Sequence, residues 1–203
     1  MKKIFSILAL CSVILFSGCQ GPTKKPEKEE VKNYALKTLL DGFIAESPEM
    51  TNNEITLGDA SDKLAIVTKQ NIGDSLQLIS ELPLEFEMAL EYPNEIYIKT
   101  PGMYVAKFGF GEFQSKTKLS DKYKASFIVF SIVDKETVSK LKKGSFYTIK
   151  GTFKDFANCK GSFQLPSGKC IDNPPKISSY KDELSFNFGT LIVENISFVE
   201  IGQ

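Results

Sequence analysis

The second half of the chain alternates apolar and polar residues with a period of two, which is typical of strands with one buried face. This alternation predicts strands over residues 85–92 and 104–110. Residues 123–133 are apolar on both faces, which predicts a central strand covered on each side. Further strands are predicted over 145–153, 184–188 and 191–201. The expected buried faces of the first two strands are Phe86, Met88, Leu90 and Tyr92, and Tyr104, Ala106, Phe108 and Phe110.

Two segments show helical signals instead. Apolar residues recur at helical spacing from Glu29 to Glu46 and stop near Pro48, which predicts an amphipathic helix whose apolar stripe packs on the core. A short second helix is predicted between Asp134, a good N-cap, and Gly144, with lysines in its last turn.

Residues 47–83 carry weaker signals. We expect turns at 52–53, 58–59 and 71–74, and a short strand over 63–68. The apolar stretch 76–82 fits either a strand or a helix.

These elements predict a mainly β (α+β) fold with an N-terminal helix and one short internal helix. Their order from residue 84 to 201 (strands, short helix, strand, long loop, strand) resembles the oligonucleotide/oligosaccharide-binding (OB) fold. The piece Leu141–Gly151 is similar to the joint between the helix and the fourth strand in small exported members. The resemblance implies an antiparallel OB-like barrel, and an open β-sandwich is the alternative.

The first twenty residues have the pattern of an export signal. Two lysines precede an apolar run from Ile4 to Phe16, which at about 1.5 Å per residue is shorter than the roughly 30 Å of a bilayer core. Ser17 and Gly18 then stand directly before Cys19. This combination resembles the lipobox of bacterial lipoproteins, although Phe16 replaces the leucine usual at its position. The resemblance implies that Cys19 is lipidated and becomes the first residue of the mature protein, with an ordinary cleaved secretory signal as the alternative.

The chain thus divides into a signal peptide (1–18), a lipidated cysteine with a flexible polar tether (19–30) and one globular β-rich domain (31–203). The resemblance implies attachment to a membrane of the cell envelope. Gln20 in place of aspartate after the cysteine favours the outer membrane if the cell is Gram-negative.

Composition excludes several chemistries. The 203 residues carry 25 basic side chains, all lysines, against 25 acidic ones, and histidine, arginine and tryptophan are absent. A His-containing catalytic triad, a His-ligated zinc site and an arginine phosphate clamp are therefore impossible. Without the signal, 23 lysines face 25 acids, a net charge of −2, so there is no basic field to gather nucleic acid. We expect no catalytic residues, cofactor or metal.

Cysteines give one further prediction. Cys11 leaves with the signal and Cys19 is the lipid site, so Cys159 and Cys170 remain as a pair. In an exported protein such a pair indicates a disulfide, which for a loop this short stabilises by roughly 3 kcal/mol.

Two charged groups allow a functional interpretation. Glu85, Glu87 and Glu91 on one strand suggest a carboxylate pair for glycoside hydrolysis, but acids on an exposed strand face are more often solubilising. A basic group suggests binding of anionic lipid or an acidic glycan, although a solvated helix end is the simpler interpretation; it comprises Lys135, Lys140, Lys142 and Lys143.

The sequence therefore predicts a lipid-anchored, non-catalytic binding or interaction module of the envelope, whose partner is another envelope protein or a glycan and not nucleic acid. A histidine-free hydrolase that works with carboxylates or lysine is the alternative. A structural lipoprotein without a ligand is a third. Oligomeric state is left open.

Overall fold

The structure is a computed structural model that describes residues 34–72, 76–92, 102–111, 119–157, 165 and 171–202. The predicted signal peptide and tether, including Cys19, lie outside the described residues. So do Cys159 and Cys170.

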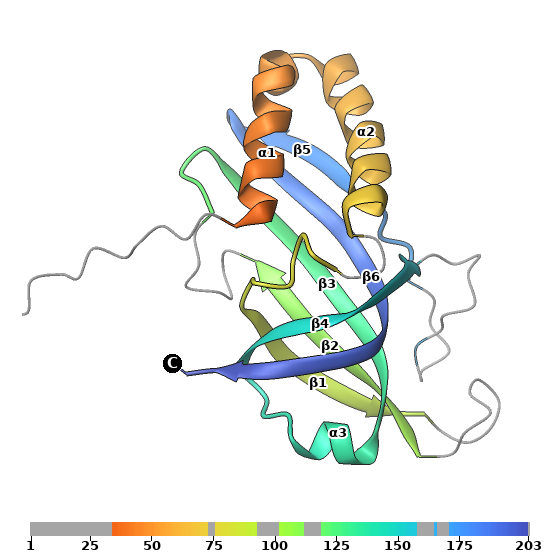
Figure 1. Cartoon of the computed structure of the whole chain (residues 1–203). Coiled ribbons are helices and arrows are strands. Elements are labelled where there is room, and N and C mark those ends of the chain that lie inside the picture. The colour runs from red at the N-terminus through yellow and green to blue at the C-terminus, as the bar shows by residue number, and fades with distance from the viewer. Residues whose placement is uncertain are drawn as a thin grey trace, which may run out of the picture. The chain divides into compact units, whose positions relative to one another are not determined.

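The described residues form a mainly β fold in which all strands belong to one sheet (Figure 1). Neighbouring strands are antiparallel, except that β3 also pairs with β6 in parallel. The predicted fold class, mainly β with helices, is confirmed. The strands are β1 (Leu84–Glu91), β2 (Met103–Gly111), β3 (Tyr123–Asp134), β4 (Phe146–Phe156), β5 (Lys176–Tyr180) and β6 (Glu183–Ile201).

The order of strands in the sheet is β3-β2-β1-β4-β6-β5, and the extra β3–β6 pairing links its first strand to its fifth. Five strands therefore pair in a cycle, and β5 is added outside it along the first part of β6. The 19-residue β6 makes this possible, because residues 183–187 pair with β5 and residues 191–201 pair with β4. The fifth strand, β5, was not predicted.

Alternation along β2 and β3 follows the prediction. Phe108, Phe110 and Phe127 are buried in the main core, where the rings of Phe110 and Phe127 stack at 5.1 Å. Phe130 faces the other side of β3 and is buried in a second apolar cluster with Val105 and Ile192. As predicted, β3 is covered on both faces.

In β1 the predicted buried face is wrong at Met88 and Leu90, whereas Phe86 and Tyr92 are buried as predicted. Phe86 lies opposite Phe108 and Met88 lies opposite Lys107, so β1 contains one extra residue, Glu87, between these two pairs. This β-bulge at Glu87 reverses the alternation. Met88 and Leu90 consequently face solvent, with 41% and 38% of their surface exposed, whereas Phe86 is buried.

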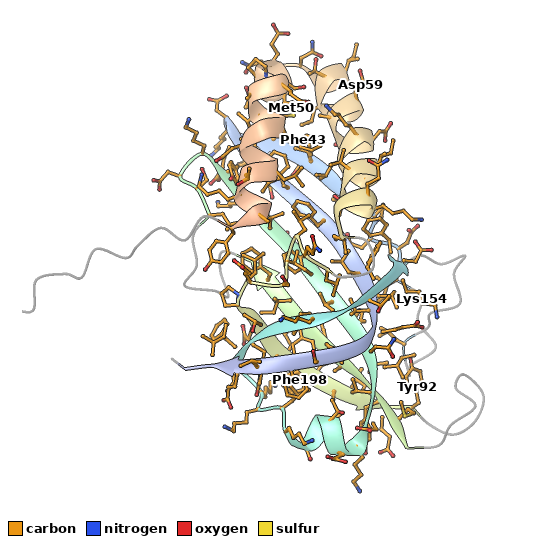
Figure 2. All side chains as sticks on the ribbon, viewed as in Figure 1. Phe43, Met50, Asp59, Tyr92, Lys154 and Phe198 are labelled. Carbon is orange, nitrogen blue, oxygen red and sulfur yellow. The ribbon has the colours of Figure 1, made fainter. Side chains whose placement is uncertain are left out.

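The helical part of the described chain packs over β5 and β6 (Figure 1). It consists of α1 (Ala35–Glu46), the 3₁₀ turn η1 (Pro48–Thr51) and α2 (Glu54–Ile72). The predicted helix ending near Pro48 is confirmed as α1. Its apolar stripe packs on the core through Leu36, Leu40 and Phe43, whose ring lies edge-on to Phe186 of β6 at 6.5 Å (Figure 2).

The predicted turn at 58–59 and strand at 63–68 are wrong, because both fall inside α2. Asn53 caps this helix: its Oδ1 accepts hydrogen bonds from the N–H groups of Ile55 and Thr56 at 3.0 and 3.2 Å. Ala60, Leu64 and Thr68 are buried at a spacing of four residues, so packing against the sheet outweighs the low helix propensity of the glycine and β-branched residues. Leu76–Leu82 forms turns, neither strand nor helix.

The short internal helix is confirmed as α3 (Lys135–Ser139), although it is shorter than predicted. Its N-cap is Asp134, whose Oδ1 accepts a hydrogen bond from the N–H of Thr137 at 2.7 Å. The helix ends at its C-cap Lys140, so the predicted stop at Gly144 and the predicted lysines in the last turn are wrong. Gly144 has φ +79°, a left-handed conformation that favours glycine, in the loop before β4.

Candidate functional site

A groove of about 350 Å³ lies where β1, β2, β3 and β6 meet the segment before β5. We call it the β groove. Apolar groups at its base include the stacked rings of Phe110 and Phe127. Its polar lining comes from five separate segments and comprises Glu87, Lys107, Ser126, Asn173 and Asn187.

The charged part of the β groove is an ion pair between the Glu87 carboxylate and the Lys107 ammonium group. Both side chains are mostly buried, with 18% and 23% of their surfaces exposed. The bulge in β1 is what places the extra residue, Glu87, beside the outward-facing Lys107. A mostly buried carboxylate held in place by an ammonium group is suited to orient a polar ligand.

The two amides of the groove are held by the bulge in β6. The Asn187 Oδ1 accepts a hydrogen bond from the Gly189 N–H at 2.7 Å, and the Asn173 Nδ2 donates to the Thr190 Oγ1 at 3.2 Å. The remaining polar groups of these amides, the NH₂ of Asn187 and the Oδ1 of Asn173, have no hydrogen-bond partner among the described residues. The groove therefore presents a fixed donor and a fixed acceptor near a charge pair.

A second cavity, of about 330 Å³, lies beside α1 and is lined by Lys37, Asp41, Ser120 and Lys122. The hydrogen bond from Lys37 is the main cause that lowers the pKa of Asp41, helped by a bond from the Tyr123 hydroxyl at 3.1 Å and by the charge of Lys122. Because Asp41 neutralises one of the two lysines, the described lining of this cavity carries a net charge of +1.

The three strand glutamates do not converge. Only Glu87 lines the β groove, and Glu91 is exposed at the end of β1. Among the described residues, each cavity is lined by one carboxylate, and that carboxylate is paired with a lysine. The structure does not bring together the carboxylate pair that a glycosidase uses.

The basic group at the end of α3 is partly neutralised. Lys140 pairs with Glu136 at 2.7 Å, and Lys142 reaches Glu200 of β6 at 3.0 Å. The hydrogen bonds to these carboxylates are the main cause that raises the pKa of both lysines. The solvated, ion-paired helix end is thus the better interpretation of Lys140 and Lys142.

The described residues contain no cluster of three acidic, cysteine or histidine side chains able to hold a metal ion. No helix in the described ranges is long and apolar enough to cross a bilayer. Comparison of the chain with protein families, curated proteins and solved structures found no match.

Cys159 and Cys170 lie outside the described residues, but the described residues on either side of them meet at one point of β6. Thr190 accepts a hydrogen bond from the Ala157 N–H at 2.7 Å and donates one to the Asn173 carbonyl at 3.1 Å. Ala157 and Asn173, which flank the predicted disulfide loop in the sequence, therefore meet at Thr190. The disulfide stays a prediction.

Sequence reasoning missed the groove residues Ser126, Asn173 and Asn187. Each is a single polar residue in or beside a strand, where polar residues are ordinary. Ser126 and Asn187 become neighbours only through the parallel register of β3 and β6. No local pattern could have identified them as a group.

Proposed function

We propose that this chain is a lipid-anchored binding module of the bacterial cell envelope, attached through Cys19, with the β groove as its ligand site. The β groove carries the binding role. It combines an apolar floor, two pre-oriented amides and a half-buried ion pair in a volume that suits a small ligand segment. The ligand is an extended loop of another envelope protein or a glycan.

We further propose that the fold is OB-like, a closed barrel rather than an open sandwich. The cycle β1–β2–β3–β6–β4–β1 supports this assignment, as do the parallel β3–β6 pair and the position of α3 between β3 and β4. In OB folds the face formed by the second and third strands binds ligands, and the β groove includes residues of β2 and β3.

Nucleic acid is not the proposed ligand. Single-stranded nucleic acid is bound by exposed aromatic side chains among basic residues, whereas Phe108, Phe110 and Phe127 are buried here. The one lysine in the groove's described lining is paired with Glu87.

The anchor is tested by metabolic labelling with an alkyne-bearing fatty acid and by partition into a detergent phase. The parent chain should carry the label and enter the detergent phase. Cys19→Ser should lose both properties, with Cys11→Ser as the matched control that keeps them. A labelled Cys19→Ser chain would refute the anchor.

The binding role is tested with a photo-crosslinking amino acid introduced in intact cells at Ser126, in the β groove. The matched control places it at Ile66, which is 60% exposed on α2. We expect a crosslinked adduct from position 126 and none from position 66, and its mass should identify the ligand as protein or glycan. Lys107→Met, which breaks the ion pair, should lower the yield of this adduct. Equal adducts from both positions, or none from Ser126, would contradict a ligand site in the groove.

A further inference from the structure

Among the described residues, the last eight residues of β6, Glu194–Ile201, have no pairing partner on one side of the strand. Strand β3 pairs with β6 only as far as Val193, and beyond that residue β6 pairs with β4 alone. Figure 1 shows this half of β6 turning away from β3 and running beside β4 to the C-terminus. The backbone hydrogen bonds that residues 194–201 make all run to β4. We call the other side of this segment the open edge.

Two other edges of the sheet, those of β5 and β1, are protected. At β5, the Ser61 hydroxyl of α2 accepts a hydrogen bond from the Ile177 N–H at 3.0 Å and lies 3.4 Å from its carbonyl oxygen, so a side chain replaces a neighbouring strand. In β1, the side away from β2 carries the bulge at Glu87 and the exposed Glu91 at its end, and both hinder the addition of another strand. Bulges, charges and covering side chains are the usual means by which proteins block strand addition.

The open edge has no such protection after Asn195. Residues 196–201 contain no lysine, proline or glycine. Their one charged residue, Glu200, is neutralised by Lys142 at 3.0 Å. Ser197 and Val199 face solvent on the outer side, and 68% of Val199 is exposed. Ile196 and Phe198 are partly buried, pack against the main core and hold the strand in place.

We propose that the open edge binds the same edge of a second copy of this chain, so that two β6 strands pair antiparallel across a two-fold axis. Two identical edges can pair in this way because the interface of a two-fold dimer uses the same surface twice. A register with Phe198 on the axis sets Ser197 opposite Val199 and Glu200 opposite Ile196. No two carboxylates then face each other, and the outer row is uncharged, so pairing carries no like-charge cost.

One added strand pair is a small interface, in the weak class below roughly 1,200 Å². Anchoring both copies in one membrane raises their effective concentration. Residues 20–33 comprise 14 residues and can span up to about 48 Å at roughly 3.4 Å each, which leaves each copy room to turn its edge toward the other. The dimer is therefore expected on membranes more than in dilute solution. It uses a surface separate from the β groove, so it holds or fails independently of the ligand site.

The first test is cysteine crosslinking in intact cells that express the full chain. Ser197→Cys and Val199→Cys, which the proposed register sets opposite each other, are co-expressed on differently tagged chains and compared with Ile66→Cys on α2 and with the parent chain, which controls for the natural cysteines. We expect a disulfide-linked dimer between the Ser197→Cys chain and the Val199→Cys chain, several-fold above Ile66→Cys. Dimer no more abundant than in that control, or adducts with other proteins only, would overturn the proposal.

The second test separates pairing from damage to the fold. Val199→Lys and Val199→Glu are expressed with different tags, singly and together, and each should melt as the parent does because the side chain is exposed. Each variant alone should co-purify with itself less than the parent, whereas the Lys and Glu variants together should restore co-purification. If the mixed pair associates no better than either like-charged pair, the two edges do not meet.

Discussion

Gly189 is the residue whose replacement the structure predicts most sharply. It lies at the bulge in β6 with φ +77°, a conformation that L side chains rarely adopt. A Cβ atom built there would lie 2.3 Å from the carbonyl oxygen of Asn173, far inside contact distance. That carbonyl accepts the hydrogen bond from Thr190, and it belongs to backbone that a substitution cannot displace freely.

The cost of Gly189→Ala follows from these contacts. The left-handed conformation costs alanine about 1–2 kcal/mol. Displacing the Asn173 carbonyl removes a hydrogen bond worth about 1 kcal/mol. The smaller conformational freedom of alanine in the unfolded chain returns about 0.4–1 kcal/mol. We expect a net loss of about 2 kcal/mol, which for a chain of this size lowers Tm by roughly 4–8 °C.

The assay is equilibrium unfolding in urea, with thermal melting as a second readout. Gly58→Ala is the matched control, since Gly58 lies within α2 with no other atom within 4 Å of a built Cβ. That variant should gain about 0.5–1 kcal/mol, because alanine favours helix more than glycine does. If Gly189→Ala unfolds within about 0.5 kcal/mol of the parent, as surface substitutions do, then the close approach of residues 173–175 to the bulge is refuted.

Three further predictions concern other parts of the fold. The Thr68 hydroxyl is buried without a hydrogen-bond partner in the described part of the chain, so Thr68→Val should raise the unfolding free energy by about 1 kcal/mol, whereas Thr68→Ser should lower it. Hydrogen bonds from Thr137 lower the pKa of Asp134 below its usual 3.8. The ionised Asp134 therefore stabilises the fold above pH 3.8, and this stabilisation is lost as the pH falls through the lowered pKa. In melting experiments from neutral to acid pH, Asp134→Asn should lose less stability than the parent does. Reducing the predicted Cys159–Cys170 disulfide should cost roughly 3 kcal/mol in urea unfolding and expose two thiols, and two reactive thiols without reductant would end that prediction.

Local sequence patterns correctly predicted the elements that keep the same buried face along their whole length. The alternation through Phe108 and Phe110, the doubly apolar stretch of β3 and the cap at Asp134 each depend on a few neighbouring residues. Those features fold as the sequence indicates because the residues that determine each of them are close neighbours in the sequence.

The wrong predictions share a different cause. The bulge at Glu87 has no signature of its own, yet it reversed the faces of Met88 and Leu90. In α2, Gly58 and a β-branched run suggested a turn and a strand, and only contact of Ala60 and Leu64 with the core favours the helix. Both outcomes depend on the tertiary contacts of the segment, which cannot be read from its own sequence.

The sequence by itself determined the mainly β class, the first helix, the short helix after β3 and the absence of histidine and arginine chemistry. It also carries the predictions for Cys19, Cys159 and Cys170. Only the tertiary structure decided the β groove and the open edge, because both arise from the register between strands that are distant in sequence. The parallel register of β3 and β6 brings Ser126 beside Asn187, and its end at Val193 leaves the last half of β6 unpaired. Such pairings are fixed by burial across the whole sheet, not by any local run of residues.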